Sequence, residues 1–410
     1  MTETLAIVGA GHAAGQLVAS LVMGGYEGQI VLFGNESVAP YQRPPLSKKY
    51  LQGELPAERL LLKPESFYPD NGVELHLNEP VTAIDIESRS LQYGDGQTLR
   101  WDKLVFATGS RVTQLPVPGA ESPGVHYLRS IADVDAIRAA FAPGKRLLII
   151  GGGYIGLEVA AVGVAAELDV ALVEIAPRLL SRVASPQLSE FYLDVHRNAG
   201  VDIQLSTGVE RIEPHDNGLR VTLNDDRSID TDLIVIGIGV SAETTLAASA
   251  GLKVDNGILV DEHCQTSAAD VFAIGDCTNH PNPLLEKRLR LESVPNALAQ
   301  GRCAAATILG APKAYAEIPW FWSDQYDLKL QMVGLTDGYD DTVIRGDMAA
   351  RKFACFYLRD GVLIGVDAVN SPKEFMLSKP AIAAGARIPT DVLADPDASL
   401  KDAATLWPGV

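Results

Sequence analysis

The segment IIGGGYIGLE, residues 149–158, decides the fold of this chain. An apolar run leads into Gly151, Gly153 and Gly156, whose GxGxxG spacing is typical of a dinucleotide-binding turn between a strand and a helix. The first glycine permits the tight turn, the second lets the backbone approach a pyrophosphate, and the third lets the helix pack on the strand. The helix N-terminus then offers free N–H groups to the phosphates.

A second motif of this kind stands 142 residues earlier, counted from Gly9 to Gly151. Gly9, Gly11 and Ala14 form GxGxxA in IVGAGHAAG, and both motifs are predicted to connect a strand to a helix. The alternative interpretation is two glycine-rich structural turns. The predicted elements of the first unit are strand 5–8, helix 13–23, strand 30–33 and, in segment 102–110, a closing strand that runs into Thr108-Gly109. Those of the second unit are strand 146–150, helix 155–166, strand 170–173 and, in segment 231–242, a closing strand that runs into Gly237 and Gly239. This pattern predicts a duplicated Rossmann-type unit that binds two dinucleotides.

An acidic residue is expected after each motif, where it would bond the ribose hydroxyls. Glu174 ends the strand VALVE, 18 residues beyond Gly156, and its carboxylate would repel a 2′-phosphate. This favours NAD(H) over NADP(H), although Arg178 could fold back, contact the cofactor or backbone, or pair with an acid. The corresponding residue of the first motif is Glu36. The NAD site is expected to include also Tyr154, Ile155 and Gly237.

Composition excludes several classes of protein. The net charge of −18 is unsuited to binding nucleic acid. The four cysteines are scattered, which argues against a disulfide framework and fits a reducing cytoplasm. The N-terminus begins without a basic signal region, and no apolar stretch is long enough to span a membrane. Cys277 and His280 have metal-like spacing but no second pair, so no metal site is expected.

Two bound nucleotides require two roles. NAD(H) exchanges, so the resident partner that accepts hydride is expected to be FAD, held by the first motif. The expected fold is α/β, with an FAD-binding domain of residues 1–110 and 239–315 and an NAD-binding domain of residues 111–238. Residues 316–410 are expected to form an α+β C-terminal domain, with a hairpin around Asp360-Gly361 and a helix after Pro372.

At this point the chain resembles a known family. It is similar to the FAD-dependent NADH:ferredoxin reductases of bacterial oxygenase systems, which serve cytochrome P450 or ring-hydroxylating dioxygenase enzymes and share the glutathione-reductase-like fold. The resemblance covers essentially the whole chain. The segments that carry it, besides the first glycine motif, are PYQRPPLSKKYL (40–51), FATGS (106–110), IIGGGYIGLEVA (149–160), VFAIGDC (271–277) and WFWSDQYD (320–327).

The resemblance implies roles for single residues. Lys48 would lie near the flavin N5, Glu158 would lie near the nicotinamide and pair with Lys48, and Trp322 would face the flavin close to the electron exit. The other implied FAD contacts are Arg43 and Pro44 beside the isoalloxazine, Thr108, Gly109, Asp276 at the ribityl chain, and Val294 beside the dimethylbenzene or pyrimidine side. Relatives often carry a tryptophan where this chain has Leu289 or Leu291, so the resemblance assigns no stacking residue on that side.

Simpler interpretations stand beside these roles. Lys48 could be a solvated lysine after a turn, and Pro44-Pro45 alone indicates only a rigid bend. Glu158 could favour the dipole of its helix, worth about 0.3–1 kcal/mol. Trp320 and Trp322 could be core or interface residues.

The electron acceptor is expected to be a separate protein, because residues 34–53 contain no cysteine that could act beside the flavin. Flavin can release electrons singly, which suits a [2Fe–2S] ferredoxin. Lys287, Arg288 and Arg290 form the densest basic run and are expected to help dock this partner, together with Lys329, Arg351 and Lys352, unless the run is simply solvated. Two rival hypotheses are a rubredoxin reductase and an NADH-sensing binding protein resembling apoptosis-inducing factor. The chain is expected to be a monomer or weak dimer.

Overall fold

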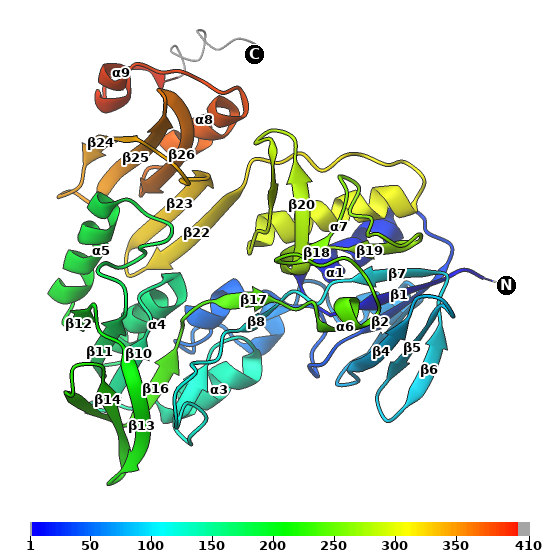
Figure 1. Ribbon diagram of the computed structural model, residues 1–410, viewed down its shortest axis with the longest axis horizontal. Coiled ribbons are helices and arrows are strands. Elements are labelled where there is room, and N and C mark those ends of the chain that lie inside the picture. Colours follow the sequence, from blue (N-terminus) through cyan, green and yellow to red (C-terminus); the bar gives the residue numbers. More distant parts are fainter. Residues whose placement is uncertain (1, 401–410) are drawn as a thin grey trace. The chain divides into compact units, whose positions relative to one another are not determined.

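The computed structural model describes residues 2–400, which form two compact units of interleaved chain (Figure 1). Unit 1 consists of Met1–Gln42, Ala57–Arg111 and Ser241–Pro319. Unit 2 consists of Arg43–Pro56, Val112–Val240 and Trp320–Val410. Each unit is therefore assembled from three separate stretches of sequence.

Unit 1 is built on a five-stranded parallel sheet in the order β19-β7-β1-β2-β3. Two long helices, α1 (His12–Met23) and α7 (Val294–Ile308), pack against each other beside it. A three-stranded antiparallel sheet, β4-β5-β6, belongs to the same unit. The strands are β1 (Thr4–Val8), β2 (Gln29–Phe33), β3 (Val73–His76), β4 (Val81–Asp85), β5 (Ser90–Tyr93), β6 (Gln97–Arg100), β7 (Lys103–Phe106) and β19 (Val271–Ala273).

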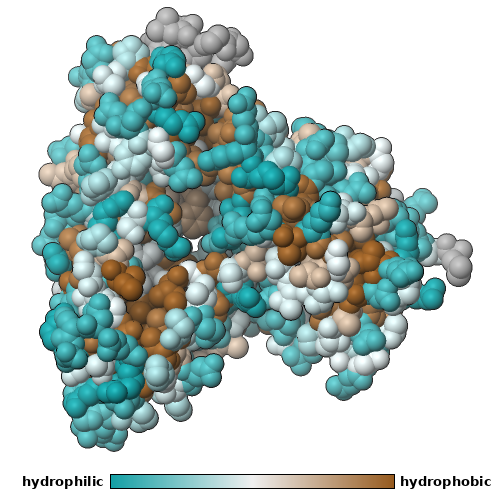
Figure 2. All heavy atoms as spheres, viewed as in Figure 1, coloured by the Kyte–Doolittle hydropathy of each residue, from teal (hydrophilic) through white to brown (hydrophobic). Residues whose placement is uncertain are grey.

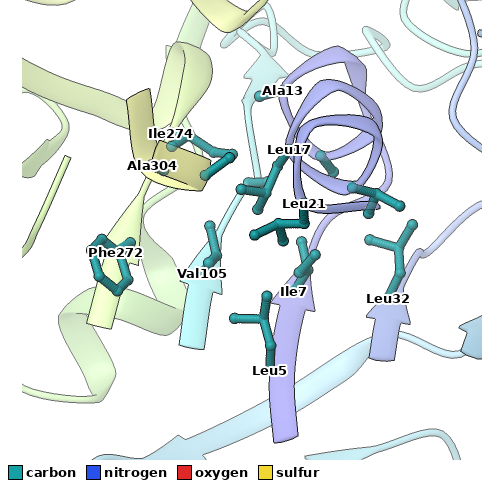
Figure 3. Close-up of a cluster of buried hydrophobic side chains, with 14 of the residues drawn as sticks. Leu5, Ile7, Ala13, Leu17, Leu21, Leu32, Val105, Phe272, Ile274 and Ala304 are labelled. Atoms are coloured by element: carbon teal, nitrogen blue, oxygen red, sulfur yellow. The ribbon is translucent and has the colours of Figure 1, made fainter. Parts of the chain in front are cut away.

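Strand periodicity divides the core of unit 1 into two layers. Leu5 and Ile7 of β1 pack with Leu17 of α1, whereas Ala6 and Val8 belong to the opposite layer with residues of β4 and β5. Figure 3 shows the leucines of α1 directed at β1 and β7 in the first layer. Both faces of the parallel sheet are buried, as its continuous apolar strands require.

Unit 2 repeats this plan with a parallel sheet in the order β12-β11-β10-β16-β9. A three-stranded antiparallel sheet, β13-β14-β15, covers one face through a shared apolar cluster. The strands are β9 (Val125–Tyr127), β10 (Arg146–Ile150), β11 (Asp169–Glu174), β12 (Asp202–Leu205), β13 (Val209–His215), β14 (Gly218–Leu223), β15 (Ser228–Thr231) and β16 (Leu233–Ile236). The helices are α3 (Ile131–Ala140), α4 (Tyr154–Ala165) and α5 (Pro186–Asn198).

The C-terminal part of unit 2 is a five-stranded antiparallel sheet in the order β22-β23-β26-β25-β24. Helix α8 (Pro372–Ala383) packs on β23 and β26, and α9 (Thr390–Ala394) packs on β24. The strands are β22 (Trp320–Gln325), β23 (Leu328–Gly334), β24 (Asp341–Asp347), β25 (Lys352–Arg359) and β26 (Val362–Val369).

The remaining elements are short. They are the strands β8 (Ser110–Val112), β17 (Val240–Ala242), β18 (Ile258–Leu259), β20 (Thr278–Asn282) and β21 (Lys287–Leu289), the helices α2 (Phe67–Asp70) and α6 (Thr245–Ser249), and the 3₁₀ turns η1 (Pro44–Ser47), η2 (Ala57–Leu60) and η3 (Gly275–Cys277). Within residues 2–400, no helix combines the length and apolar character needed to cross a membrane.

The structure confirms the predicted α/β fold class and the duplicated strand–turn–helix–strand units, each within a residue or two of the predicted bounds. The predicted hairpin is also present. Asp360 and Gly361 connect β25 to β26 with φ values of 51° and 73°, which is the geometry of a type I′ turn.

Candidate active site

The first glycine turn of unit 1 admits no side chain at its first position. Gly9 follows β1 with a φ of 110°, and a Cβ there would lie 2.2 Å from the carbonyl oxygen of Ala107. The closing strand β7 therefore runs directly against the turn. This contact fixes the path of the chain into α1.

The second glycine turn has the same construction in unit 2. Gly151 has a φ of 112°, and a Cβ there would lie 2.5 Å from the carbonyl oxygen of Gly237. Gly156 allows α4 to approach the turn, because its Cβ would lie 2.1 Å from the carbonyl oxygen of Gly151. In unit 1 the buried Ala14 occupies the corresponding position. The two turns are thus equivalent in structure as well as in sequence.

The middle glycine of each turn faces open space. Gly11 and Gly153 are the N-cap residues of α1 and α4, and a Cβ on either would meet no atom within 4 Å. Neither N-cap residue caps its helix with a side chain, and a helix N-terminus offers N–H donors of the kind that a phosphate accepts from. Both turns therefore fit the pyrophosphate of a dinucleotide.

Glu174 lies beside the second turn, as predicted. Its Oε2 accepts a hydrogen bond from the N–H of Gly152 at 2.6 Å, and its Oε1 accepts one from Ala176 at 2.7 Å. Each oxygen keeps a lone pair that could accept from a ribose hydroxyl. Arg178 instead points into unit 2, where it donates to the carbonyls of Ser181 and Ala184 and to the hydroxyl of Ser189. Its guanidinium thus contacts backbone, one of the three expected alternatives.

The predicted FAD residues of unit 1 gather around the first turn. Gly9 contacts the backbone between Ala107 and Thr108, and the Thr108 hydroxyl donates to the carbonyl of Glu243 at 2.6 Å. Asp276 lies in η3, where its Oδ2 accepts from the hydroxyl of Ser110 at 3.1 Å. The neighbouring Gly275 lies close to the start of α1, since a Cβ there would be 3.1 Å from that of Ala13.

Three other predicted residues of unit 1 lie just after a strand or at the start of a helix. Glu36 follows β2 and its Oε2 accepts from the hydroxyl of Tyr41 at 2.6 Å. Gly109 follows β7 with a φ of 67°, and its carbonyl accepts from the N–H of Glu243. Val294 is the first residue of α7, after the N-cap Ser293.

A buried carboxylate with three side-chain donors lies within unit 2. Glu158 is 2% exposed, and Lys48 places its Nζ 2.8 Å from Oε2. The hydroxyl of Ser47 also donates to Oε2, and that of Ser323 donates to Oε1 at 2.5 Å. Segments more than 100 residues apart thus meet at one carboxylate, and the expected pairing of Lys48 with Glu158 is present.

This geometry disfavours the simpler interpretations of the pair. Lys48 is only 16% exposed on its side chain, so it is not a solvated lysine. Glu158 lies beyond the first turn of α4 and is buried, so its main interaction is not with the helix dipole. Removing a charge from water costs free energy, which pairing and hydrogen bonding offset only in part. Buried charge pairs of this kind are typical of functional sites.

Arg43 and Pro44 hold the backbone before Lys48. Arg43 donates from Nη1 to the carbonyl of Arg129 at 2.6 Å, and Pro44 begins the turn η1. The Pro44 carbonyl lies 3.4 Å from the Lys48 Nζ. The rigid turn therefore presents Ser47 and Lys48 together to Glu158.

An aromatic row runs along β22 next to this carboxylate. Trp322 immediately precedes Ser323, and its ring centroid lies 5.7 Å from that of Trp320 and 6.2 Å from that of Phe321. Phe321 in turn lies 5.3 Å from Tyr154, the first residue of α4. Trp322 is half-buried, so it is not part of the fully buried core.

The predicted NAD residues Tyr154 and Ile155 differ in exposure. Burial raises the pKa of Tyr154 well above its ordinary value, and its hydroxyl contacts the Met332 Sδ at 2.8 Å. Ile155 is 40% exposed and Ile175, after Glu174, is 77% exposed. In the space-filling view, hydrophobic residues gather over the part of unit 2 that contains β10 and β16 (Figure 2). Tyr154 is half-buried against Met332 and Phe321, whereas the two isoleucines are exposed and available to a ligand.

Sequence reasoning missed Ser47 and Ser323. Ser47 lies directly before Lys48, and Ser323 lies in the quoted segment WFWSDQYD. Because residues i and i+2 of a strand share a face, Ser323 and Gln325 could have been identified as one polar face of a strand. The contact between Ser323 and Glu158 could not have been predicted, since the two residues lie 165 positions apart.

The basic run is partly engaged within unit 1. Arg288 donates to the Oδ1 of Asn279 at 3.2 Å and to the carbonyl of Val260 at 2.7 Å. Arg290 forms an ion pair with Glu292. Arg351 of unit 2 lies 2.9 Å from Asp327. These pairings reduce the net positive field at Arg290 and Arg351.

The cysteines of the described chain are all buried and unpaired: Cys264, Cys277, Cys303 and Cys355. Burial raises the pKa of Cys277 and raises that of Cys355 to about 12, which keeps both thiols protonated and unreactive. Within residues 2–400, no group of three or more His, Cys, Asp or Glu residues is arranged to hold a metal.

Comparison with known proteins gives consistent findings. The model of the pyridine nucleotide-disulphide oxidoreductase family matches residues 3–301, and a reductase C-terminal model matches residues 320–404. The chain is 44% identical to the 5,5′-dehydrodivanillate O-demethylase ferredoxin reductase subunit of Sphingobium sp. strain NBRC 103272 / SYK-6, over 97% of each chain. It is 41% identical to the putidaredoxin reductase of Pseudomonas putida, over 98% of this chain and 96% of that one.

A solved structure shares the whole fold. The covalent complex of putidaredoxin reductase with putidaredoxin contains a chain that matches with a TM-score of 0.95 and 40% identity, covering 100% of this chain and 99% of that one. The likeness therefore extends over both units.

Proposed function

Because the chain belongs to the pyridine nucleotide-disulphide oxidoreductase family, we propose that it is an FAD-containing reductase. It takes hydride from NADH and passes electrons singly to a [2Fe–2S] ferredoxin that serves an oxygenase such as a cytochrome P450. The observation that carries this proposal is the pair of glycine turns, each with an open cradle at the N-terminus of a helix. A single chain with two such cradles is suited to a resident and an exchanging dinucleotide.

The proposed domain roles follow the two turns. Residues 1–110 and 239–315 bind FAD, residues 111–238 bind NADH, and residues 316–410 form a C-terminal domain. The FAD site includes Gly9, Gly11 and the residues around them, and the NAD site includes Gly151, Gly153 and Glu174. FAD, when bound, supplies the chemistry that accepts a hydride and releases single electrons.

Glu174 supports NADH rather than NADPH as the donor. Its carboxylate lies on the second turn, where a 2′-phosphate would meet a negative charge. Arg178, the nearest candidate cation in sequence, is held by three hydrogen bonds inside unit 2. Reduction by NADH is therefore expected to be at least about tenfold more efficient than by NADPH, a difference of roughly 1.4 kcal/mol.

The proposed roles of Lys48, Glu158 and Trp322 concern the flavin. Lys48 supplies a positive charge that favours the reduced, anionic flavin, and Glu158 orients that charge by pairing with it. Trp322 lies on the electron exit. A separate protein as electron acceptor is supported by the absence of cysteine from residues 34–53 and by burial, which raises the pKa values of the Cys277 and Cys355 thiols.

The four unpaired cysteines also support a cytoplasmic location, where NADH is available. A monomer or weak dimer is the proposed oligomeric state.

Ferredoxin docking is proposed to use Lys287, Arg288 and Arg290. Arg290 is half-buried and paired with Glu292, whereas Arg288 is exposed and its hydrogen bonds go to uncharged oxygens of Asn279 and Val260, so Arg288 is the better single test. Reversing the charge with Arg288→Glu should weaken ferredoxin binding several-fold at low salt and reduce its salt dependence. Arg227→Glu, on an exposed pair with Asp225, is the matched control. Identical salt profiles for both variants would contradict this docking site.

The test of the proposed function is an anaerobic stopped-flow experiment on the protein with its flavin. NADH or NADPH is mixed first, and a [2Fe–2S] ferredoxin from the same genome is mixed second. Fast flavin bleaching by NADH followed by fast ferredoxin reduction is the expected result. Bleaching without onward transfer would shift the proposal to rubredoxin or to an NADH-sensing role, and no bleaching would overturn it.

A further inference from the structure

Glu158 is the end of a chain of hydrogen bonds that crosses unit 2. The Ser323 hydroxyl that donates to Glu158 accepts from the Nε2 of Gln325 at 3.2 Å. The Oε1 of Gln325 lies 2.9 Å from the Nε2 of His196, on α5. The Nδ1 of His196 lies 3.1 Å from the hydroxyl of Tyr326. We call these four residues, Ser323, Gln325, His196 and Tyr326, the Glu158 chain.

The Glu158 chain leads from the interior to the surface. Ser323 and His196 have no exposed surface, and Gln325 is 1% exposed. Tyr326 is 38% exposed and lies in the turn between β22 and β23 with a φ of 54°.

The direction of each hydrogen bond follows from the carboxylate outward. A carboxylate only accepts, so the Ser323 hydroxyl donates to Glu158 and must accept from the amide nitrogen of Gln325. This leaves the Gln325 oxygen facing His196, whose Nε2 must therefore carry the hydrogen.

Burial lowers the pKa of His196, which keeps the imidazole neutral, although the bond to Gln325 acts in the opposite direction. A neutral imidazole with a hydrogen on Nε2 has an unprotonated Nδ1, which accepts from Tyr326. All four donors consequently point toward Glu158. Aligned hydrogen bonds polarise one another, so the outer ones strengthen the inner ones.

From this geometry we infer that His196 and Gln325 are positioning residues for the Lys48–Glu158 pair. They fix the Ser323 hydroxyl on Oε1, which turns Oε2 toward Lys48. Gln325 cannot pass a proton without converting its amide to the imidic acid, so the chain orients and stabilises charge instead of conducting protons. The effect on flavin reduction rests on the proposed function.

The variant that breaks the chain is His196→Leu, which removes the donor to Gln325 and frees its amide to rotate. The limiting rate of flavin bleaching by NADH should fall at least about fivefold, while the NADH concentration at half-saturation changes less than about twofold. His196→Gln keeps an amide N–H near the position of Nε2 and should restore the rate to within about twofold. Tyr326→Phe removes only the outermost bond and should give a smaller loss.

A second measurement tests the chain without turnover. In the oxidised holoenzyme, ¹⁵N NMR of labelled histidine should find His196 neutral, with the hydrogen on Nε2, from pH 6 to pH 8. The Glu158→Gln variant should shift the His196 resonances, although the two side chains do not touch. It should also make the kinetic effect of His196→Leu smaller than in the wild type, because both changes interrupt one chain.

The outcomes separate the two proposals. A wild-type limiting rate in a folded His196→Leu variant, or a hydrogen on Nδ1 of His196, would overturn the positioning role. Absence of any NADH-driven bleaching in the wild type would instead overturn the proposed function, while the NMR result would still decide the direction of the chain.

Discussion

In both turns, the first and the middle glycine are required for different reasons. The first glycine is a conformational requirement, because Gly9 and Gly151 combine a positive φ with a carbonyl oxygen where a Cβ would lie. The middle glycine is not needed for folding, because Gly11 and Gly153 have ordinary extended backbones and a Cβ there would meet no protein atom. It is needed instead to leave space for the ligand. Folding and binding can therefore be separated by neighbouring substitutions.

Gly151→Ala should lower the free energy of unfolding by roughly 2–4 kcal/mol, because it adds both backbone strain and a steric clash. Gly153→Ala should leave the melting temperature within a few degrees of the wild type but raise the NADH concentration at half-saturation about tenfold. Thermal unfolding and flavin-bleaching titrations check the two effects. Equal stability losses in both variants would show that the cradle is not open.

At the scale of elements, a single arginine holds the C-terminal segment. Arg345 of β24 is 2% exposed, and its Nη atoms donate to backbone carbonyls at and beyond the end of α9. These acceptors are Val392, Leu393, Asp395, Pro396 and Ala398. Its Nε lies 3.4 Å from Glu374 of α8, close enough for charge attraction but poorly aligned for a hydrogen bond.

Arg345→Met should therefore cost roughly 2–4 kcal/mol of stability, because it removes the buried donor to five backbone carbonyls and leaves Glu374 without this positive charge. Hydrogen exchange should rise first in residues 390–398. The matched control is Arg351→Met in the turn between β24 and β25, which removes an exposed ion pair and should cost less than about 1 kcal/mol. Similar losses in both variants would contradict the role of Arg345.

Some elements could be predicted from the sequence because their signals are local. The helices α1 and α4 follow an apolar strand and a glycine turn, and the β25–β26 turn needs two residues that tolerate a positive φ. The sheet β4-β5-β6 was not predicted, since its strands are four or five residues long and mostly exposed.

The Lys48–Glu158 pair was expected only through resemblance, and the chain beyond it was not expected. His196 and Gln325 are 129 residues apart, and nothing in the local pattern around His196 distinguishes it from the other six histidines. Likewise, no sequence signal indicated that residues 43–56 pack with unit 2. Long-range packing of this kind is determined by the tertiary fold, which local patterns do not encode.

At the scale of the whole molecule, one buried carboxyl group should affect stability over a wide pH range. Asp367 lies in β26, 2% exposed, and accepts a hydrogen bond from the Tyr357 hydroxyl at 2.6 Å. Burial raises the pKa of Asp367 to about 7, against an opposing effect of Tyr357. Between the ordinary pKa near 4 and this value, the native state holds a proton that the unfolded chain has released.

The contribution of Asp367 to stability should therefore be fully present below about pH 4, and it should be lost as the pH rises through about 7. The Asp367→Asn side chain cannot ionise. The free energy of unfolding of this variant, relative to that of the wild type, should therefore increase by roughly 2–3 kcal/mol from pH 5 to pH 8. Urea denaturation at several pH values measures the difference. Asp341→Asn, on the exposed edge of the same sheet, is the control, and a pH-independent difference for Asp367→Asn would contradict the assignment.

The interleaving of the two units also governs how the chain folds as it leaves the ribosome. The strand β19, which completes the sheet beside β7, and the helix α7, which packs on α1, are among the last parts of unit 1 to be synthesised. At about 5–20 residues per second, the apolar face of the nascent α1 waits roughly 15–60 s for α7. During that interval it is a target for chaperones, so cellular yield depends on translation rate as well as on the stability of the finished protein.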